Sequence, residues 1–242
     1  MPVDDNGLDI TSGIQNYPDA RFALITPAHQ SPLGVALSLA RRHQILEWAD
    51  RSQAWIIEDD YDSEFRYHGK PLPALKSLDA PQRVIYAGTF SKALFPELRC
   101  AWLVVPVKQI AQFRHQASLA PCAVPVLWQN TLADFLREGH FWRHLKKMRQ
   151  HYAQRRQWIE QALTQQGFQV VPQKGGIQMV IRMIGDDIAH ARKANAAGLA
   201  VQALSDWRIR SSGEGGLLLS FTNIVNEGMA RQVAQQLRKA LS

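Results

Sequence analysis

The sequence contains few cysteines and no long hydrophobic run. Its 242 residues include two cysteines, Cys100 and Cys122, whose spacing to each other and to the eight histidines matches no metal-ligand pattern. Both lie in apolar stretches, so we expect buried thiols. The apolar stretches are short, such as Leu103–Pro106, whereas a membrane-spanning helix needs about 20 such residues. The sequence therefore predicts neither a metal site on these cysteines nor a membrane partner.

A secretion signal and a DNA-reading pattern are also lacking. Met1–Tyr17 shows no charged start followed by an apolar region and a small-residue cleavage site, so we expect a cytoplasmic protein. Neither a helix-turn-helix nor a zinc-finger pattern occurs. The net charge of +7 would attract phosphate groups, but much of the excess lies in Arg137–Arg156, in a pattern typical of a solvated helix face. We expect no specific DNA binding by this chain alone.

The first half of the sequence alternates between short apolar runs and helical patterns. After an irregular lead-in over Met1–Tyr17, strands are predicted at 22–26, 54–57, 83–87 and 100–105. A helix is predicted from Ser31-Pro32, with Ser31 as N-cap, to about Arg51, and a short helix over Leu72–Leu78. The apolar runs are continuous rather than alternating, which is typical of strands covered on both faces. The sequence thus predicts an α/β fold with a mainly parallel sheet.

The second half, from Gln109 onward, is first helical and then mixed. A very long helix is predicted from about Gly139 to Gln165. Beyond it we predict strands at 169–171, 177–181 and 217–221 and helices at 190–203 and 227–241. We therefore expect a large domain over residues 1–138, and a long helix with a small α+β domain over residues 139–242.

Three clusters of polar residues lie where predicted strands end. They span 26–34, 58–65 and 88–92, and the last is followed by Arg99. In an open α/β sheet, ligands bind outside the carboxyl ends of the strands. The three clusters would bring a carboxylate, a phenol, an amine, hydroxyls and a guanidinium to one edge of the sheet.

This set of groups matches the needs of one cofactor. An amine at a strand end, such as Lys92, can form a Schiff base, and the Asp59 carboxylate can keep a heteroaromatic nitrogen protonated. The Tyr61 phenol can hydrogen-bond a ring hydroxyl. Donors for a phosphate are available on Thr89, Ser91 and Arg99. Each residue alone is a weak signal, but together they describe pyridoxal 5′-phosphate (PLP) more closely than any other cofactor.

At these strings the sequence resembles the fold type I aminotransferases, and above all the aminotransferase-like domain of MocR-type regulators of the GntR superfamily. The resemblance covers nearly the whole chain and rests on the segments TPAHQSPLG, RRHQILEWA, WIIEDDYDSEFRYHGKPLPAL, VIYAGTFSKALFPELR and FLREGHFWRHLKKMRQHYAQRR. It implies a fold type I PLP-dependent transferase-like α/β fold. Here that would be a partial large domain with a mainly parallel sheet, plus a small α+β C-terminal domain.

The resemblance also implies a role for each matching residue. Lys92 would be the catalytic lysine that holds PLP as an imine. Asp59 would pair with the pyridine nitrogen, and Tyr61 would hydrogen-bond the phenolic oxygen. The phosphate would be held by Thr89, Ser91 and Arg99.

The first string departs from the family. It usually reads Asn-Pro-x-Gly, and Ser31 stands where that asparagine would bond the cofactor oxygen. His29 or Gln30 could substitute, while helix capping by Ser31 is an equally open interpretation. We therefore keep Ser31 and His29 as candidate cofactor ligands.

The sequence also departs from the family pattern where a substrate carboxylate would bind. Many transaminases carry an arginine before a Leu-Ser-Phe-like string, and Leu217–Phe221 has none. Arg208 and Arg210 lie close by, either as substitutes or as surface charge. Gln178 stands where the family commonly has a histidine. The sequence indicates an amine or amino acid, without a narrower class.

Three hypotheses about function follow from the resemblance. Family members join a winged helix-turn-helix domain by a linker to a complete aminotransferase domain, and this chain begins inside the latter, at Val3–Leu8. We therefore expect weak PLP binding. The chain could be an effector-sensing or transaminase module derived from a regulator, an active amino acid aminotransferase, or a truncated remnant that binds no cofactor. We expect a homodimer with a small amine or amino acid as effector or substrate.

Overall fold

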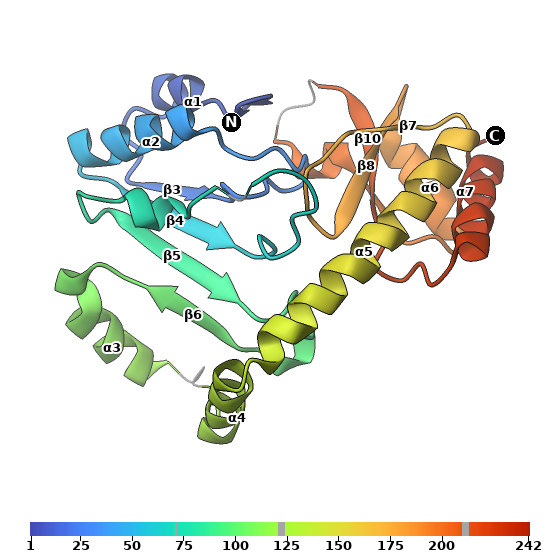
Figure 1. Cartoon of the computed structure of the whole chain (residues 1–242). Helices are drawn as coiled ribbons and strands as arrows, with labels where there is room; N and C mark the ends of the chain where they lie inside the picture. The colour runs from blue at the N-terminus through green and yellow to red at the C-terminus, as the bar shows by residue number, and fades with distance from the viewer. Residues whose placement is uncertain (71, 121–123, 210–212) are drawn as a thin grey trace. The chain divides into compact units, whose positions relative to one another are not determined.

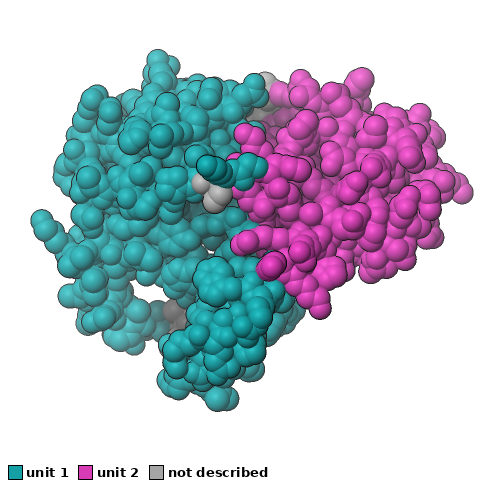
Figure 2. Space-filling model, in the orientation of Figure 1, with its two compact units in different colours: residues 1–31, 35–64, 69–145 teal, residues 32–34, 65–68, 146–242 magenta. Residues whose placement is uncertain are grey.

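The computed structural model describes residues 1–70, 72–120, 124–209 and 213–242. The chain divides into two compact units, which Figure 2 distinguishes by colour. Unit 1 comprises Met1–Ser31, Val35–Glu64 and Gly69–Leu145, and unit 2 comprises Pro32–Gly34, Phe65–His68 and Lys146–Ser242. The domain boundary between residues 138 and 139 stays a prediction. No helix in the described ranges is long and apolar enough to cross a bilayer.

Unit 1 is built on a four-stranded sheet with the order β3-β4-β5-β6. The strands are β3 (Phe22–Ile25), β4 (Trp55–Asp60), β5 (Val84–Thr89) and β6 (Ala101–Val104). The first three run parallel and β6 runs antiparallel to β5 (Figure 1). The prediction of a mainly parallel sheet is confirmed. As a consequence, the carboxyl ends of three neighbouring strands lie at one edge of the sheet.

One face of this sheet is covered by α2 (Leu39–Arg51). Ile45 and Ala49 of the helix belong to one core cluster with Ile56 of β4 and Val84 of β5. Removing a side chain of the size of isoleucine or valine from water contributes about 1.5–3 kcal/mol. The short helix α1 (Ile10–Asn16) contacts α2, and the 3-10 turn η1 (Leu75–Leu78) contacts β5. This packing fixes the strands whose ends carry the polar clusters.

Two predictions for unit 1 are wrong. The lead-in is ordered, because β1 (Val3–Asp4) and β2 (Gly7–Leu8) form a hairpin and the Asp9 carboxylate caps α1 by accepting the Ser12 N–H at 3.2 Å. The helix predicted from Ser31-Pro32 instead begins at Leu39, with Ser38 as its N-cap. Gly34 has a φ of 75°, a left-handed conformation that interrupts a helix.

The loop before α2 is held by Arg42, a buried arginine of the same helix. Its guanidinium donates at 2.7–2.9 Å to the carbonyls of Leu37, Pro73 and Pro27. Backbone carbonyls in a buried loop need partners, and a planar guanidinium supplies several donors at once. Hydrogen bonding therefore determines the path of this loop against its local helix propensity.

Three helices follow β6. They are α3 (Ile110–Leu119), α4 (Val126–Arg137) and α5 (His140–Gln165), with the 3-10 turns η2 (Pro96–Leu98) before β6 and η3 (Val107–Gln109) after it. The long helix predicted from Gly139 is confirmed. Every residue of α3 is at least partly exposed, and Leu132 is the buried residue of α4. Cys100 is buried as expected, and Cys122 lies outside the described residues.

Unit 2 contains an antiparallel sheet with the order β7-β8-β10-β9 and two helices. Its elements are β7 (Gln169–Val170), β8 (Gln178–Met183), α6 (Asp187–Ala196), β9 (Val201–Ala203), η4 (Leu204–Trp207), β10 (Gly215–Ser220) and α7 (Glu227–Leu241). Its core joins Ile159 of α5 to Ile181, Leu217 and Ala234. The predicted small α+β domain is confirmed.

One helix prediction in unit 2 is wrong. The helix predicted over 190–203 covers Asp187–Ala196, and Val201–Ala203 is strand β9. Gly198, with a φ of 86°, ends the helix in a left-handed conformation. The Asn195 side chain then both donates to and accepts from the Val201 backbone at 3.0 Å, which turns the chain into the strand.

Candidate functional site

The parallel register brings the three predicted clusters together. Ile25 of β3 pairs with Glu58 of β4, and Asp59 of β4 pairs with Ala87 of β5. The loops that follow these strands therefore start side by side, and residues 26–31, 59–62 and 89–92 all belong to unit 1. We call this place the polar edge.

The acidic string at the end of β4 places its carboxylates in different surroundings. Side chains alternate along a strand, so Glu58 and Asp60 share one face and Asp59 lies on the other. Glu58 and Asp60 are each held by two hydrogen bonds of 2.7–2.8 Å. Their donors are the backbone N–H groups of Leu75 and Lys76 and the hydroxyls of Ser63 and Tyr86. Both carboxylates are therefore engaged in holding the fold.

Asp59 is the carboxylate of this string that has no partner among the described residues. No side chain or N–H in the described part of the chain makes a hydrogen bond or ion pair with it. Burial raises the pKa of Asp59, and the carboxylates of Asp60 and Asp62 raise it further. Asp59 lines a hollow of about 220 Å³ together with Thr26, Gln30 and Ser31. A cation in this hollow would stabilise the charged form.

Tyr61 extends the polar edge with a phenol. Its hydroxyl donates to the His29 carbonyl at 3.2 Å and lies 3.1 Å from His29 Nδ1. Burial raises the pKa of Tyr61 and the Asp62 carboxylate raises it further, while a hydrogen bond with the Ser31 side chain opposes them. Tyr61 is therefore a protonated phenol that can donate a hydrogen bond.

The loop after β5 presents hydroxyls and cations. Thr89 Oγ1 accepts the Ser91 N–H at 3.1 Å and lies 3.0 Å from Ser91 Oγ. Lys92 and Arg99 are exposed, and within the described ranges neither side chain has a hydrogen bond or ion pair. Arg99 follows η2 with a φ of 49°. Two unpaired cations and two hydroxyls suit an anion such as a phosphate.

Aromatic packing holds this loop in place. The sequence analysis does not predict this packing. Phe90 packs against Trp102 of β6 and Phe141 of α5, with ring centroids 4.6 and 5.6 Å away. His144 Nε2 lies 2.9 Å from the Ala93 carbonyl. Aromatic pairs of this kind contribute about 0.5–1.5 kcal/mol beyond their buried area. The partners lie 12 to 51 residues away in sequence, so no local pattern could reveal them.

The remaining predicted residues are more scattered. Ser31 caps no helix, and its N–H donates to Thr26 Oγ1 at 3.1 Å in a turn. Arg208 belongs to unit 2, where its guanidinium donates to the Glu214 carbonyl. Gln178, also in unit 2, starts β8 opposite Ser220. Arg210 lies outside the described residues.

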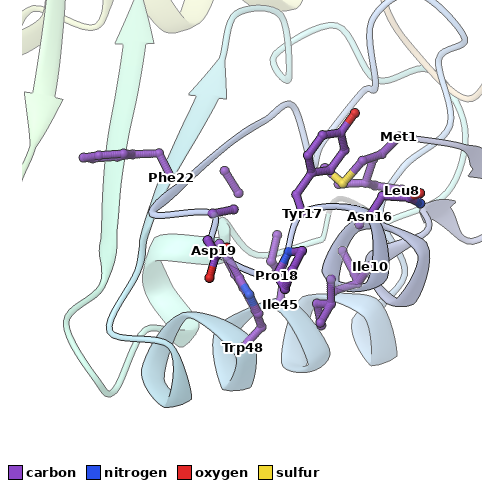
Figure 3. A pocket seen from close by; sticks show the side chains of 14 residues that line it. Met1, Leu8, Ile10, Asn16, Tyr17, Pro18, Asp19, Phe22, Ile45 and Trp48 are labelled. Atoms are coloured by element: carbon purple, nitrogen blue, oxygen red, sulfur yellow. The ribbon is translucent and has the colours of Figure 1, made fainter. Parts of the chain in front are cut away.

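A second hollow in unit 1, of about 550 Å³, lies at the amino-terminal end of β3. Figure 3 shows Met1, Ile10, Tyr17 and Trp48 gathered around it. Asp19 is the charged side chain of an otherwise mostly apolar lining, and no lysine or arginine is among the described residues that line this hollow. The described residues also contain no group of three or more His, Cys, Asp or Glu that could hold a metal. The polar edge is therefore the candidate site.

Comparison with known proteins identifies relatives along the whole chain. The family model for aminotransferase class I and II matches residues 4–213. The probable rhizopine catabolism regulatory protein MocR of Rhizobium meliloti is 35% identical over 99% of this chain and 49% of its own length. The pyridoxine biosynthesis regulator PdxR of Corynebacterium glutamicum is 31% identical over 100% of this chain and 52% of its own. The chain thus spans about half the length of these curated relatives.

Solved aminotransferase structures share the fold of this chain, and one curated aminotransferase is similar to it in sequence. Kynurenine aminotransferase of Pyrococcus horikoshii superposes with a TM-score of 0.88 and 24% identity, over 100% of this chain and 62% of its own. The α-aminoadipate aminotransferase LysN of Thermus thermophilus gives 0.87 and 25%, over 100% and 64%. Aromatic-amino-acid aminotransferase 1 of Thermococcus litoralis is 28% identical over 67% of this chain and 41% of its own. The chain belongs to the aminotransferase class I and II family and is an aminotransferase-like domain homologous to those of the MocR-type regulators.

Proposed function

We propose that the polar edge of unit 1 binds PLP and that Lys92 holds it as an imine. In this proposal Asp59 pairs with the protonated ring nitrogen and Tyr61 donates to the ring oxygen. The phosphate is held by Thr89, Ser91 and Arg99. Ser31 and His29 both contact the Tyr61 hydroxyl, and in this proposal they act on the same ring oxygen through it.

The observation that carries this proposal is the isolation of Asp59. Two neighbouring carboxylates are held by hydrogen bonds of 2.7–2.8 Å, and Asp59 is left in a hollow with a raised pKa. An unpaired, partly buried carboxylate destabilises a fold unless a positive partner arrives. A protonated pyridine nitrogen is such a partner, and the unpaired amine and guanidinium after β5 suit the aldehyde and the phosphate of the same molecule.

The residues divide the chemical work between them. When bound, PLP supplies an aldehyde that condenses with amines and a ring that withdraws electrons from the adjoining carbon. Asp59 keeps the proton on the ring nitrogen, and the Tyr61 O–H stabilises negative charge on the ring oxygen. Lys92 Nζ would supply the amine that holds the aldehyde carbon, and as a free amine it could hold or move a proton.

We further propose that the chain is an amine- or amino-acid-sensing module of a MocR-type regulator and works as a homodimer. Regulators such as MocR and PdxR match it at 31–35% identity over nearly all its residues, which supports this role. The alternative is an amino acid aminotransferase, which the match to the Thermococcus enzyme favours.

Borohydride reduction in the presence of PLP tests the site. We expect mass spectrometry to find the pyridoxyl label on the peptide that contains Lys92. Lys92→Arg should abolish the label, and Lys108→Arg, which changes another exposed lysine, should retain it. A label carried mainly by a different lysine would refute the site.

Absorption spectroscopy separates the two roles. A sensor should change its PLP spectrum when an amine is added, without forming product from an added 2-oxo acid. Steady formation of a new amino acid would favour the aminotransferase instead.

A further inference from the structure

His29 and Asp62 form a buried pair next to the Tyr61 phenol. His29 follows β3 and Asp62 follows β4, and their exposed fractions are 8% and 2%. His29 Nδ1 lies 3.2 Å from Asp62 Oδ2 and 3.1 Å from the Tyr61 oxygen. One imidazole nitrogen thus faces both a buried carboxylate and the hydroxyl that the proposed function assigns to the cofactor.

The surroundings of the imidazole indicate which nitrogen carries its proton. His29 Nε2 is buried and has no hydrogen-bond partner among the residues that the structure describes. A buried N–H without an acceptor is rarer than a buried lone pair without a donor. The negative charge of Asp62 next to Nδ1 favours a proton there. Both observations place the proton on Nδ1.

The direction of the Nδ1–H bond follows from the two contacts. The contact with Asp62 has the distance of an ion pair but not the alignment of a hydrogen bond, whereas the contact with the Tyr61 oxygen has both. A hydroxyl can accept while it donates, and the Tyr61 O–H is donated to the His29 carbonyl at 3.2 Å. His29 therefore holds the Tyr61 oxygen from its ring and from its backbone.

We propose that His29 and Asp62 are positioning residues that hold the Tyr61 oxygen in place. Asp62 keeps the proton on Nδ1, and Nδ1–H is donated to the Tyr61 oxygen. The phenol O–H is then free to turn from the His29 carbonyl to a ring oxygen, and accepting a hydrogen bond makes it a stronger donor. The inference rests on the proposed PLP site, and it goes beyond that site by assigning a role to each member of the pair.

The tautomer of His29 can be measured without cofactor. Long-range ¹H–¹⁵N spectra of histidine-labelled protein distinguish a protonated Nδ1 from a protonated Nε2, and loss of one signal set in His29→Asn assigns it. We expect the Nδ1–H form in the wild-type chain and a shift away from it in Asp62→Asn. A wild-type His29 protonated on Nε2 alone would overturn the role proposed for His29 and Asp62.

A double-mutant cycle on PLP affinity tests the route through Tyr61. We expect His29→Leu and Tyr61→Phe each to weaken PLP binding about tenfold, the effect of one lost hydrogen bond. The double variant should bind no more weakly than either single variant, because both changes remove the same contact. His29→Asn should restore most of the affinity, since its amide N–H can replace Nδ1–H, and circular dichroism checks the fold of each variant.

The outcomes separate this inference from the proposed function. Additive losses in the double variant, or equal losses in His29→Asn and His29→Leu, would overturn the positioning role while leaving PLP at Lys92. A wild-type chain that takes no pyridoxyl label would overturn the proposed function, and with it the cofactor role of the pair. The NMR measurement would then still decide whether Asp62 sets the His29 tautomer.

Discussion

Asp59 in unit 1 and Asp187 in unit 2 are aspartates at the ends of regular elements, and their surroundings are opposite. Asp187 is 3% exposed and accepts the N–H of Gly216 at 2.9 Å and of Ser205 at 3.2 Å. Burial alone would raise the pKa of Asp187, but the hydrogen bonds from Gly216 and Ser205 outweigh it and lower the pKa. Among the residues that the structure describes Asp59 has no such partner, and its pKa is raised.

The difference shows how a fold separates carboxylates that hold it together from carboxylates left free. Asp187 lies in the first turn of α6, where a negative charge is favourable, and it is close enough to bridge to β10 and η4. Asp59 lies at the carboxyl end of a parallel strand, where its neighbours in the chain are also acidic. No described residue of unit 1 forms a hydrogen bond or ion pair with its carboxylate.

The largest expected effect concerns folding. Asp187→Ala leaves two backbone N–H groups without their acceptor, so we expect the free energy of unfolding to fall by about 2–5 kcal/mol. The neighbouring Asp186 caps α6 through the exposed Ala189 N–H, and Asp186→Ala should cost about 1 kcal/mol. Urea unfolding measures both, and equal losses would contradict the structural role of Asp187.

The second-largest expected effect is on cofactor affinity. Asp59→Asn keeps the shape of the side chain but removes the charge that pairs with the ring nitrogen. We expect PLP affinity to fall by about 10- to 100-fold, the effect of one charge-assisted hydrogen bond of roughly 1.5–3 kcal/mol. Fluorescence or absorbance titration measures this, with Asp187→Asn as the matched control. Wild-type PLP affinity in both variants would contradict the proposed difference between Asp59 and Asp187.

The smallest effect is on the pH dependence of stability, where the two aspartates should act with opposite sign. Asp187, with a lowered pKa, contributes stability that is present above its ordinary pKa of ~3.9 and lost as pH falls through its folded pKa. Asp59, with a raised pKa, costs stability as pH rises through its folded pKa.

Unfolding experiments between about pH 3 and about pH 7 test this sign. Asp59→Asn should be slightly more stable than the wild type at neutral pH and equal to it in acid, and the gain is small because solvent screens a partly exposed group. Asp187→Asn should be less stable at neutral pH and approach the wild type in acid. A loss of stability in Asp59→Asn at neutral pH would contradict the assignment.

Much of the fold could be predicted from the sequence because continuous apolar runs mark buried parallel strands. The four strands of unit 1 lie within a few residues of their predicted positions, and α7 matches its predicted bounds. The errors fall where long-range contacts outweigh local propensity. Ser31-Pro32 has the pattern of a helix start, but Gly34 and the carbonyls held by Arg42 impose a loop.

The candidate site could be predicted as a set of residues but not as a set of environments. The acidic string showed that carboxylates gather at one strand end, and only the structure shows that Glu58 and Asp60 are engaged and Asp59 is not. The contact of His29 with Tyr61 joins residues 32 positions apart, which no local spacing encodes.

The titration of Asp59 with and without PLP tests the central claim most directly. Carbon-13 NMR of aspartate-labelled protein follows its carboxyl group, and Asp59→Asn assigns the signal. We predict a pKa above the ordinary aspartate value in the chain alone, and a pKa below that value once PLP is bound, because a protonated ring nitrogen then faces the carboxylate. An Asp59 whose pKa is the same with PLP bound would contradict the claim that this carboxylate is the partner of the cofactor.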